Sequence, residues 1–190
     1  STFSARVTAA TMSDPYSAIT TAIGTLKGPL HGGANQRVME MLDEIPSPEA
    51  AEGWVRDRLA KGDRIMGIGH RVYKTTDPRA AILREMSEAQ AAEGDRKYHD
   101  IATRVADVAV AYFEEHRPDL KLYPNVDFYS AAVLHAAGVP TDQFTPLFAM
   151  SRVAGWMAHL LEQYADNRLI RPRGQYVGSA ERDWLPIESR

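Results

Sequence analysis

The 190-residue chain contains 44% hydrophobic and 25% charged residues and carries a formal net charge of -3, a balance typical of a soluble globular protein with a sizeable core. It has no cysteine, which excludes disulfides, thiolate zinc sites and a cysteine nucleophile, and fits the reducing cytoplasm that we expect. The negative charge argues against a nucleic-acid binder, and no apolar run approaches the roughly 20 residues of a membrane span.

Helix starts are predicted at four places along the chain. At each, a residue that caps helices well precedes a proline, whose missing N–H costs nothing at the first helical position. The four pairs are Asp14-Pro15, Ser47-Pro48, Asp77-Pro78 and Thr145-Pro146.

Apolar residues recur at helical spacing in four segments, and each stripe is expected to pack on a core. The stripes are Ile19, Ala22, Ile23 and Leu26; Ile82, Leu83, Met86 and Ala89; Ile101, Val105, Val108 and Tyr112; and Met150, Val153, Met157, Leu160 and Tyr164. We expect the third helix to end at Pro118 and a further helix to cover residues 128–137.

Strand signals are weak. Residues 72–73 and 120–123 are the only short candidates, and neither is flanked by the turn residues of a hairpin. The sequence therefore predicts an all-α fold.

Three segments between the expected helices place an ionisable group beside glycine, proline or asparagine. Residues 28–35 read Gly-Pro-Leu-His-Gly-Gly-Ala-Asn, residues 67–71 read Gly-Ile-Gly-His-Arg, and residues 124–128 read Pro-Asn-Val-Asp-Phe. Because catalytic groups are often placed on loops by a rigid scaffold, these segments are the candidate functional loops.

Two histidines lie in these loops. His31 precedes a Gly-Gly pair, where the backbone can approach a ligand closely, although an ordinary turn with an incidental histidine explains the pattern as well. His70 follows Gly-x-Gly, but Val72 stands where the third glycine of a dinucleotide fingerprint belongs. The spacing alone is weak evidence for phosphate binding.

Asp127 is the candidate base of the third loop. A carboxylate partly buried at this helix start would hold its proton more tightly than usual, which suits a general base. The alternative is a plain helix cap, a role that aspartate fills well.

Several arginines accompany these groups. Arg79 follows Pro78 in the first helical turn, where a cation opposes the helix dipole. Arg152 interrupts the apolar residues 148–156 and is costly to bury without an anion, unless it faces solvent. Arg171 and Arg173 flank Pro172 and also fit a solvated tail. Together these arginines would suit a substrate that bears several carboxylates.

The other histidines are interpreted as structural or surface residues: His99, His116, His135 and His159. No two histidines lie three to five residues apart, so we expect no metal site.

At these loops the sequence resembles the C-terminal half of citrate synthase, over essentially all 190 residues. The matching stretches are residues 28–35, 67–73 continuing to 77–79, 125–130 and 148–152, in the order found in the family. The pattern is similar to that of the bacterial Gram-positive-like type, which shares it with the 2-methylcitrate synthases.

The resemblance implies catalytic roles for three residues. Asp127 matches the base that removes a methyl proton from acetyl-CoA. His31 matches the residue that hydrogen-bonds the thioester oxygen as the enol forms. His70 matches the group that polarises the oxaloacetate carbonyl and protonates it.

The resemblance also implies binding residues. Arg79 and Arg152 match arginines that hold the substrate carboxylates, and Arg171 matches one that reaches into the site of the partner subunit. The residues that match the coenzyme A segment are Arg64, Ile65, Met66, Gly67, Gly69, Lys74 and Asn125.

By the same resemblance, residues 1–32 and 139–190 belong to a large helical domain, and residues 33–138 form most of a small one. The family has a further histidine before the position of Ser1, and the chain starts without an initiator methionine, so we expect an N-terminal half as a partner. A homodimer, coenzyme A thioester as co-substrate and no tightly bound cofactor are also implied.

Two alternatives stay open. One is a 2-methylcitrate synthase that uses propionyl-CoA, since a difference of one methyl is worth only about 1–3 kcal/mol in a pocket. The other is a non-catalytic helical fragment that binds coenzyme A or a partner chain.

Overall fold

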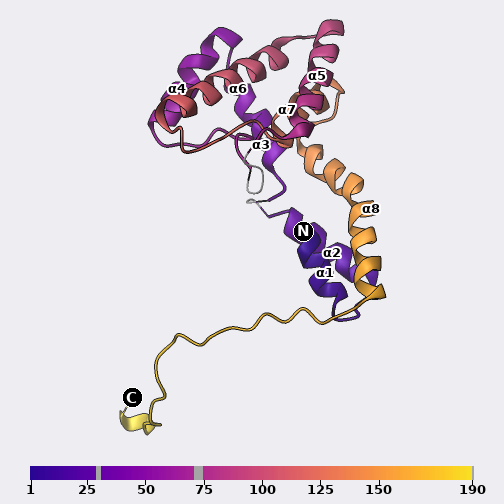
Figure 1. Cartoon of the computed structure of the whole chain (residues 1–190), viewed down its shortest axis with the longest axis vertical. Helices are drawn as coiled ribbons and strands as arrows, with labels where there is room; N and C mark the ends of the chain where they lie inside the picture. Colours follow the sequence, from indigo (N-terminus) through magenta and orange to yellow (C-terminus); the bar gives the residue numbers. More distant parts are fainter. Residues whose placement is uncertain (29–30, 71–74, 190) are drawn as a thin grey trace.

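A computed structural model describes residues 1–28, 31–70 and 75–189 of the chain (Figure 1). Over these residues it contains α-helices and short 3-10 turns, and its only β pairing is an isolated bridge between Ile68 and Pro124. The helices are α1 (Thr2–Ala9), α2 (Pro15–Leu26), α3 (Ala34–Asp43), α4 (Ala51–Ala60), α5 (Pro78–Glu93), α6 (Lys97–His116), α7 (Val126–Ala136) and α8 (Phe144–Ala165). The all-α prediction is confirmed.

Neither strand candidate is observed as a strand. Residues 120–123 are irregular, so this prediction is wrong, and residues 72–73 lie outside the described residues.

The capping prediction is confirmed at two of its four positions. Asp14 accepts a hydrogen bond from the backbone N–H of Ser17 at the start of α2, and Asp77 accepts one from that of Arg79 at the start of α5. Ser47 precedes the 3-10 turn Pro48–Ala50, which leads into α4, but its side chain makes no capping bond to the backbone.

At the fourth position the prediction is wrong, because α8 begins at Phe144, before Thr145. Phe144 is fully buried, and the 3-10 turn Thr141–Gln143 leads directly into the helix at this residue. The Thr145 hydroxyl instead donates to the carbonyl oxygen of Gly32, 3.0 Å away.

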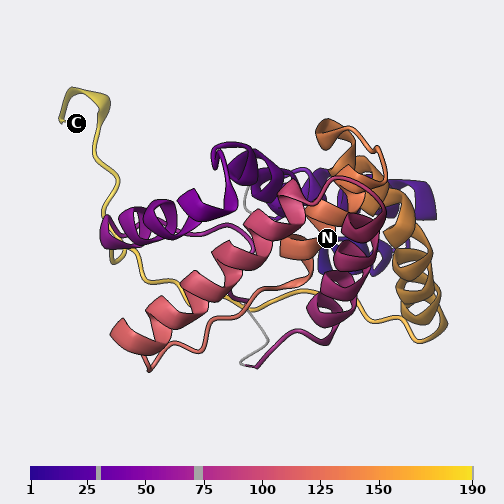
Figure 2. The ribbon, with the colours of Figure 1, turned by 90° about the horizontal axis from the view of Figure 1, so that it is seen from above.

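The first hydrophobic cluster fills the upper lobe of Figure 1, formed by α3 to α7 and the start of α8. Its largest fully buried side chains are Phe128, Phe144, Met39, Leu42, Ile45 and Ile101. Figure 2 shows α6 between α4 and α5, and α6 packs against both. Helix α7 in turn packs against α3, α5 and α6.

The second cluster joins α1, α2 and the remainder of α8. Trp156 and Leu160 of α8 pack there on Ala5, Ala18 and Leu26. Because α8 contributes Phe144 to the first cluster and Trp156 to the second, this one helix connects the two lobes (Figure 1).

The predicted stripes match the observed burial unevenly. In α6, Ile101, Val105 and Val108 are buried as predicted, and the helix ends at His116, just before Pro118. In α5 the prediction is wrong for Ile82 and Met86, which are exposed, whereas Leu83 packs against the first cluster as predicted. The buried side chains of α5 are small ones, Ala80, Ser87 and Ala91, which allow α5 to lie close to α7.

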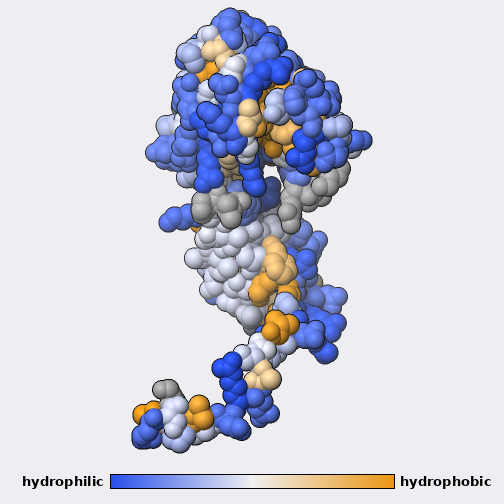
Figure 3. Space-filling model, turned by 90° about the vertical axis from the view of Figure 1, so that its left-hand side faces the viewer, coloured by the Kyte–Doolittle hydropathy of each residue, from blue (hydrophilic) through white to orange (hydrophobic). Residues whose placement is uncertain are grey.

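Smaller corrections apply to α2 and α8. Ile23 of α2 and Met150 of α8 belong to the predicted stripes but are exposed, whereas Ala22, Leu26 and Leu160 are buried as predicted. Figure 3 shows hydrophobic surface on one face of the lower lobe.

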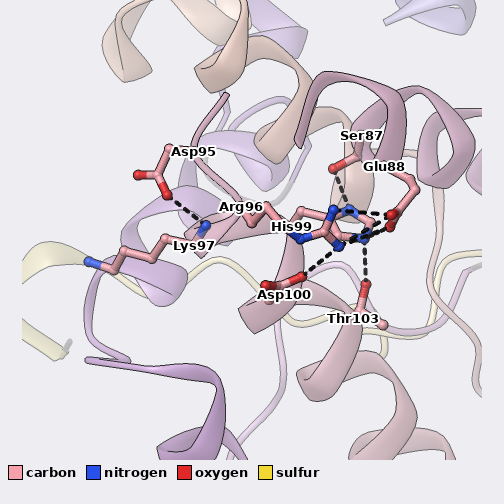
Figure 4. Close-up of polar contacts among 8 residues, drawn as sticks. All are labelled: Ser87, Glu88, Asp95, Arg96, Lys97, His99, Asp100 and Thr103. Atoms are coloured by element: carbon pink, nitrogen blue, oxygen red, sulfur yellow. Dashed lines mark hydrogen bonds and ion pairs between the residues drawn. The ribbon is translucent and has the colours of Figure 1, made fainter. Parts of the chain in front are cut away.

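A polar cluster holds α5 to α6 at the buried His99 (Figure 4). Its Nδ1 lies 2.9 Å from the Ser87 hydroxyl, and its Nε2 lies 2.5 Å from a carboxylate oxygen of Glu88. Arg96 binds the same carboxylate and also Asp100. His99 is thus a structural histidine, one of the two roles predicted for it.

The segment after α8 is largely extended and exposed, and in Figure 1 it runs away from the lobe formed by α1, α2 and α8. No helix among the described residues is long and apolar enough to cross a membrane.

We predict that Ile101→Ala lowers the free energy of unfolding of this chain by about 2–5 kcal/mol, because a fully buried side chain leaves a cavity. Ile82→Ala is the matched control, since Ile82 is 60% exposed, and its effect should stay within about 0.5 kcal/mol. Urea denaturation followed by circular dichroism measures both. Equal losses in the two variants would contradict the burial pattern.

Candidate active site

His31 lies in the turn between α2 and α3, close to the first residue of the chain. Its Nε2 is 3.0 Å from the Ser1 hydroxyl and 3.2 Å from the Ser1 amine. The neighbouring Gly32 packs on the end of α2 so closely that a Cβ there would clash with the carbonyl oxygen of Leu26. Together with the bond from Thr145 to Gly32, this contact fixes the turn between α2 and α8.

The loop that carries His70 is paired with the loop that precedes α7. Gly69 N–H donates to the carbonyl oxygen of Tyr123 at 2.7 Å, and Asn125 N–H donates to that of Gly67 at 2.9 Å. The Asn125 amide adds a bond from Nδ2 to the Gly69 carbonyl oxygen, 2.7 Å long. These bonds attach the residue next to His70 to the start of α7.

Gly67 must be glycine for two reasons. Its φ of 74° is in the left-handed region, which is strained for other residues. A Cβ at this position would also lie 2.9 Å from the Phe128 Cβ and from the Val38 Cγ2. The loop therefore lies directly on α7 and α3.

Asp127 occupies the first turn of α7 and is half-buried. The helix begins at Val126, two residues earlier than predicted, because the Asn125 side chain caps it by accepting from the Asp127 N–H at 2.9 Å. The alternative reading of Asp127 as the cap is therefore wrong. Its carboxylate is left for another role.

Asp77 fixes Arg79 beside this helix start. One carboxylate oxygen accepts from the Arg79 N–H and Nε, both at 3.0 Å. The other accepts from Arg79 Nη2 at 2.8 Å and from the Val126 N–H at 3.2 Å. The sequence predicted only the capping role of Asp77. The one signal for the additional ion pair was an arginine, Arg79, two residues after the cap.

Four of the predicted residues interact electrostatically at this site: Asp127 with Arg79, His70 and His31. Burial raises the pKa of the Asp127 carboxyl, as the sequence predicts for a base, and nearby Arg79, His70 and His31 lower it in part. Asp77 also raises this pKa through its negative charge. Asp127 is thus a carboxylate that combines partial burial with a surrounding set of cationic or hydrogen-bonding groups.

Arg152 joins this site from α8. It is half-buried, and its guanidinium carbon lies 4.9 Å from the centre of the Phe148 ring. The charge of Arg152 acts on Ser1, the residue whose hydroxyl contacts His31. The arginine therefore faces the site side of α8 and does not simply extend into solvent.

Other predicted residues are not brought to Asp127. Arg171 lies in the exposed segment after α8 (Figure 1). In the predicted coenzyme A segment, Arg64 is exposed, Met66 is half-buried, and Ile65 packs in the first hydrophobic cluster. Lys74 lies outside the described residues. Across the described ranges, no group of three or more His, Asp, Glu or Cys side chains is placed to hold a metal ion.

Comparison with known proteins gives consistent matches. Residues 1–173 match the family model described as citrate synthase, C-terminal domain. The chain is 53% identical to citrate synthase 2 of Bacillus subtilis, over all of this chain and 50% of that protein. It is 44% identical to the 2-methylcitrate synthase of Shewanella oneidensis, again over all of this chain and 49% of that protein.

A solved structure matches as well. It is the citrate synthase of Thermoplasma acidophilum in a ternary complex with carboxymethyl coenzyme A and oxaloacetate. The TM-score is 0.88 at 43% identity, over 98% of this chain and 50% of the other. The chain thus spans about half the length of the relatives that it matches.

We predict that Gly67→Ala destabilises the chain more than Gly62→Ala. Both glycines have positive φ, but a Cβ at Gly62 meets nothing within 4 Å, so Gly62→Ala should cost only the backbone strain of about 1–2 kcal/mol. Gly67→Ala adds a steric conflict with Phe128 and Val38, worth about 1–3 kcal/mol more. Urea denaturation measures the difference, and equal losses would show that the loop does not lie against α7.

Proposed function

The chain belongs to the citrate synthase family, and on this premise we propose that it supplies the C-terminal half of an enzyme that joins acetyl-CoA to oxaloacetate and hydrolyses the citryl-CoA to citrate and CoA. One observation carries the proposal. The half-buried carboxylate of Asp127, with its raised pKa, lies among Arg79, His70 and His31.

In the first step Asp127 takes a proton from the methyl group of acetyl-CoA. The methyl group is a very weak acid, so a base with a raised pKa and a donor at the thioester oxygen are both needed. His31 is the proposed donor. Its place in a fixed turn between α2 and α8 supports this role, because a preorganised donor costs no reorganisation during the reaction.

In the second step the enolate carbon attacks the carbonyl carbon of oxaloacetate. His70 donates a proton to the carbonyl oxygen as the C–C bond forms, and water then hydrolyses the thioester and releases CoA. Arg79 and Arg152 hold the oxaloacetate carboxylates, since planar guanidinium groups pair well with carboxylates. The orientation of Arg79 by Asp77 and the position of Arg152 on Phe148 support these roles.

Coenzyme A thioester is the proposed co-substrate, with no tightly bound cofactor. We place it along residues 64–69, with Lys74 and Asn125, because Asn125 and Gly69 are joined directly at the paired loops. The matching protein from Thermoplasma acidophilum was solved with a coenzyme A analogue and oxaloacetate. That complex supports the same pair of ligands here.

The domain division is a further part of the proposal. Residues 33–138 form the small domain, and residues 1–32 and 139–190 belong to the large one, with the site between them. Two separate hydrophobic clusters support this division. The buried residues of the first lie within residues 38–131, with Phe144 added from the large-domain segment, and those of the second lie within residues 5–26 and 156–160. Substrate binding between Arg79 and Arg152 would then favour approach of the two domains.

We also propose two protein partners, an N-terminal half and a second copy of the enzyme, in a homodimer of the cytoplasm. The chain spans about half of its relatives, which supports the first. Large apolar side chains of α1, α2 and α8 are exposed, which supports a partner surface there; they include Phe3, Tyr16, Ile23, Met150 and Leu161.

A 2-methylcitrate synthase is the second candidate function, because relatives with that name are 44% identical to the chain. To test both, this chain is assembled with the N-terminal half of the protein, and release of CoA thiol is measured with acetyl-CoA or propionyl-CoA and oxaloacetate. The chain has no cysteine to add background. If the assembled protein binds CoA but produces no free CoA thiol from either thioester, the non-catalytic alternative is favoured.

We predict that Asp127→Asn lowers kcat of the assembled enzyme by about 100- to 10,000-fold while CoA thioester still binds, because an amide keeps the shape but cannot accept the proton. In the unmodified enzyme, activity should fall on the acid side with a midpoint above the ordinary pKa of aspartate. The reason is that the base must be ionised and its pKa is raised. Normal turnover in Asp127→Asn would refute its role as base.

We predict that Arg171 acts across the dimer. Arg171→Ala and Asp127→Asn subunits should each be nearly inactive alone, whereas a mixed dimer should recover activity, because one of its two sites has both residues intact. Mixing at equal concentrations and measuring CoA release tests this. A mixed dimer that forms but stays inactive would contradict a shared site.

A further inference from the structure

Asp77 is a buried charge that makes more contacts than a helix cap needs. Its side chain is only 2% exposed, and a carboxylate removed from water is costly unless it is paired and fully hydrogen-bonded. Each of its two oxygens accepts two hydrogen bonds, so that four N–H donors surround it. By contrast, Asp14 caps α2 from an exposed position, where it accepts from the N–H and the hydroxyl of Ser17.

The four donors belong to two helices. Three come from Arg79 in the first turn of α5, and the fourth is the N–H of Val126 at the start of α7. Arg79 is the proposed ligand of a substrate carboxylate, and Asp127, the proposed base, follows Val126. One buried side chain therefore connects the two helix starts that carry these groups.

We propose that Asp77 is a positioning residue for the condensation. It orients the Arg79 guanidinium and links it to the start of α7. The substrate carboxylate bound by Arg79 and the base Asp127 therefore keep a fixed position relative to each other. The inference rests on the proposed function for the identity of the reaction. The role of Asp77 itself rests on its four hydrogen bonds and its burial.

The charge of Asp77 also acts on the base. It raises the pKa of Asp127, in the same direction as burial and against Arg79, His70 and His31. On its other side Asp77 lines a cavity of about 440 Å³ between α5 and α6, whose other charged residues are Arg84, Asp107 and Glu114. Arg79 is the cation bound to Asp77, and it lowers the pKa of Asp77.

The test is Asp77→Asn in the assembled enzyme. Asparagine has one acceptor oxygen and an NH₂ group, so it cannot serve all four donors. Losing hydrogen bonds to a charged group should lower kcat/KM for oxaloacetate about 10- to 100-fold, largely through a higher KM. The acid limb of the pH profile should also move to lower pH, since removing a negative charge lowers the pKa of Asp127.

Asp14→Asn is the matched control, because it changes a capping aspartate in the same way at a site far from Asp127 in the sequence. It should leave kcat/KM and the pH profile unchanged. Thermal unfolding by circular dichroism checks that each variant folds. If Asp77→Asn does not fold, Asp77→Ser, which keeps a capping oxygen for α5, is put through the same measurements.

A direct titration separates this inference from the proposed function. The Asp127 carboxyl is followed by ¹³C NMR in labelled protein, with its signal identified by its loss in Asp127→Asn. A lower Asp127 pKa in Asp77→Asn is expected whether or not the assembled enzyme condenses acetyl-CoA. An unchanged Asp127 pKa, or kinetics that match those of Asp14→Asn, would overturn the positioning role.

Discussion

Backbone N–H and C=O groups that leave a helix need new hydrogen-bond partners. At the candidate site three loops meet with only one isolated β bridge among the described residues, so side chains must supply many of these partners. Asn125 joins the loop before His70 to the start of α7, and Asp77 joins the start of α7 to Arg79. The positions of Arg79 and Asp127 relative to the loop of His70 depend on these two side chains.

The two carboxylates of the site differ because their surroundings differ. Asp77 is saturated by four donors, and its hydrogen bonds with Arg79 lower its pKa. Asp127 lies less than a turn into its helix, its cap position is taken by Asn125, and burial raises its pKa. These opposite pKa shifts support the proposed division of roles, in which Asp77 positions its neighbours and Asp127 takes the proton.

The sequence was most informative where a motif determines local geometry. Proline after aspartate predicted the starts of α2 and α5. Ionisable groups beside glycine, proline or asparagine located the loops of His31, His70 and Asp127, and the resemblance then implied their roles. Periodicity failed where a tertiary partner decides which face is buried: α5 packs on α7 through small side chains, which leaves Ile82 exposed. Val126, whose N–H donates a hydrogen bond to Asp77, lies 49 residues further along the chain, so no local sequence pattern could reveal this bond.

The continuity of α8 has a mechanical consequence. The helix has 22 residues, and at 1.5 Å per residue it is about 33 Å long. Its first residue, Phe144, is anchored in one hydrophobic cluster, and its later turns lie in the other. If α8 pivots as a rigid rod by about 10° at Phe144, the far end moves about 6 Å, but Arg152, about 12 Å along it, moves only about 2 Å. With Arg152, the proposed oxaloacetate ligand, close to the pivot, a large motion of one lobe relative to the other produces only a small displacement at the candidate site.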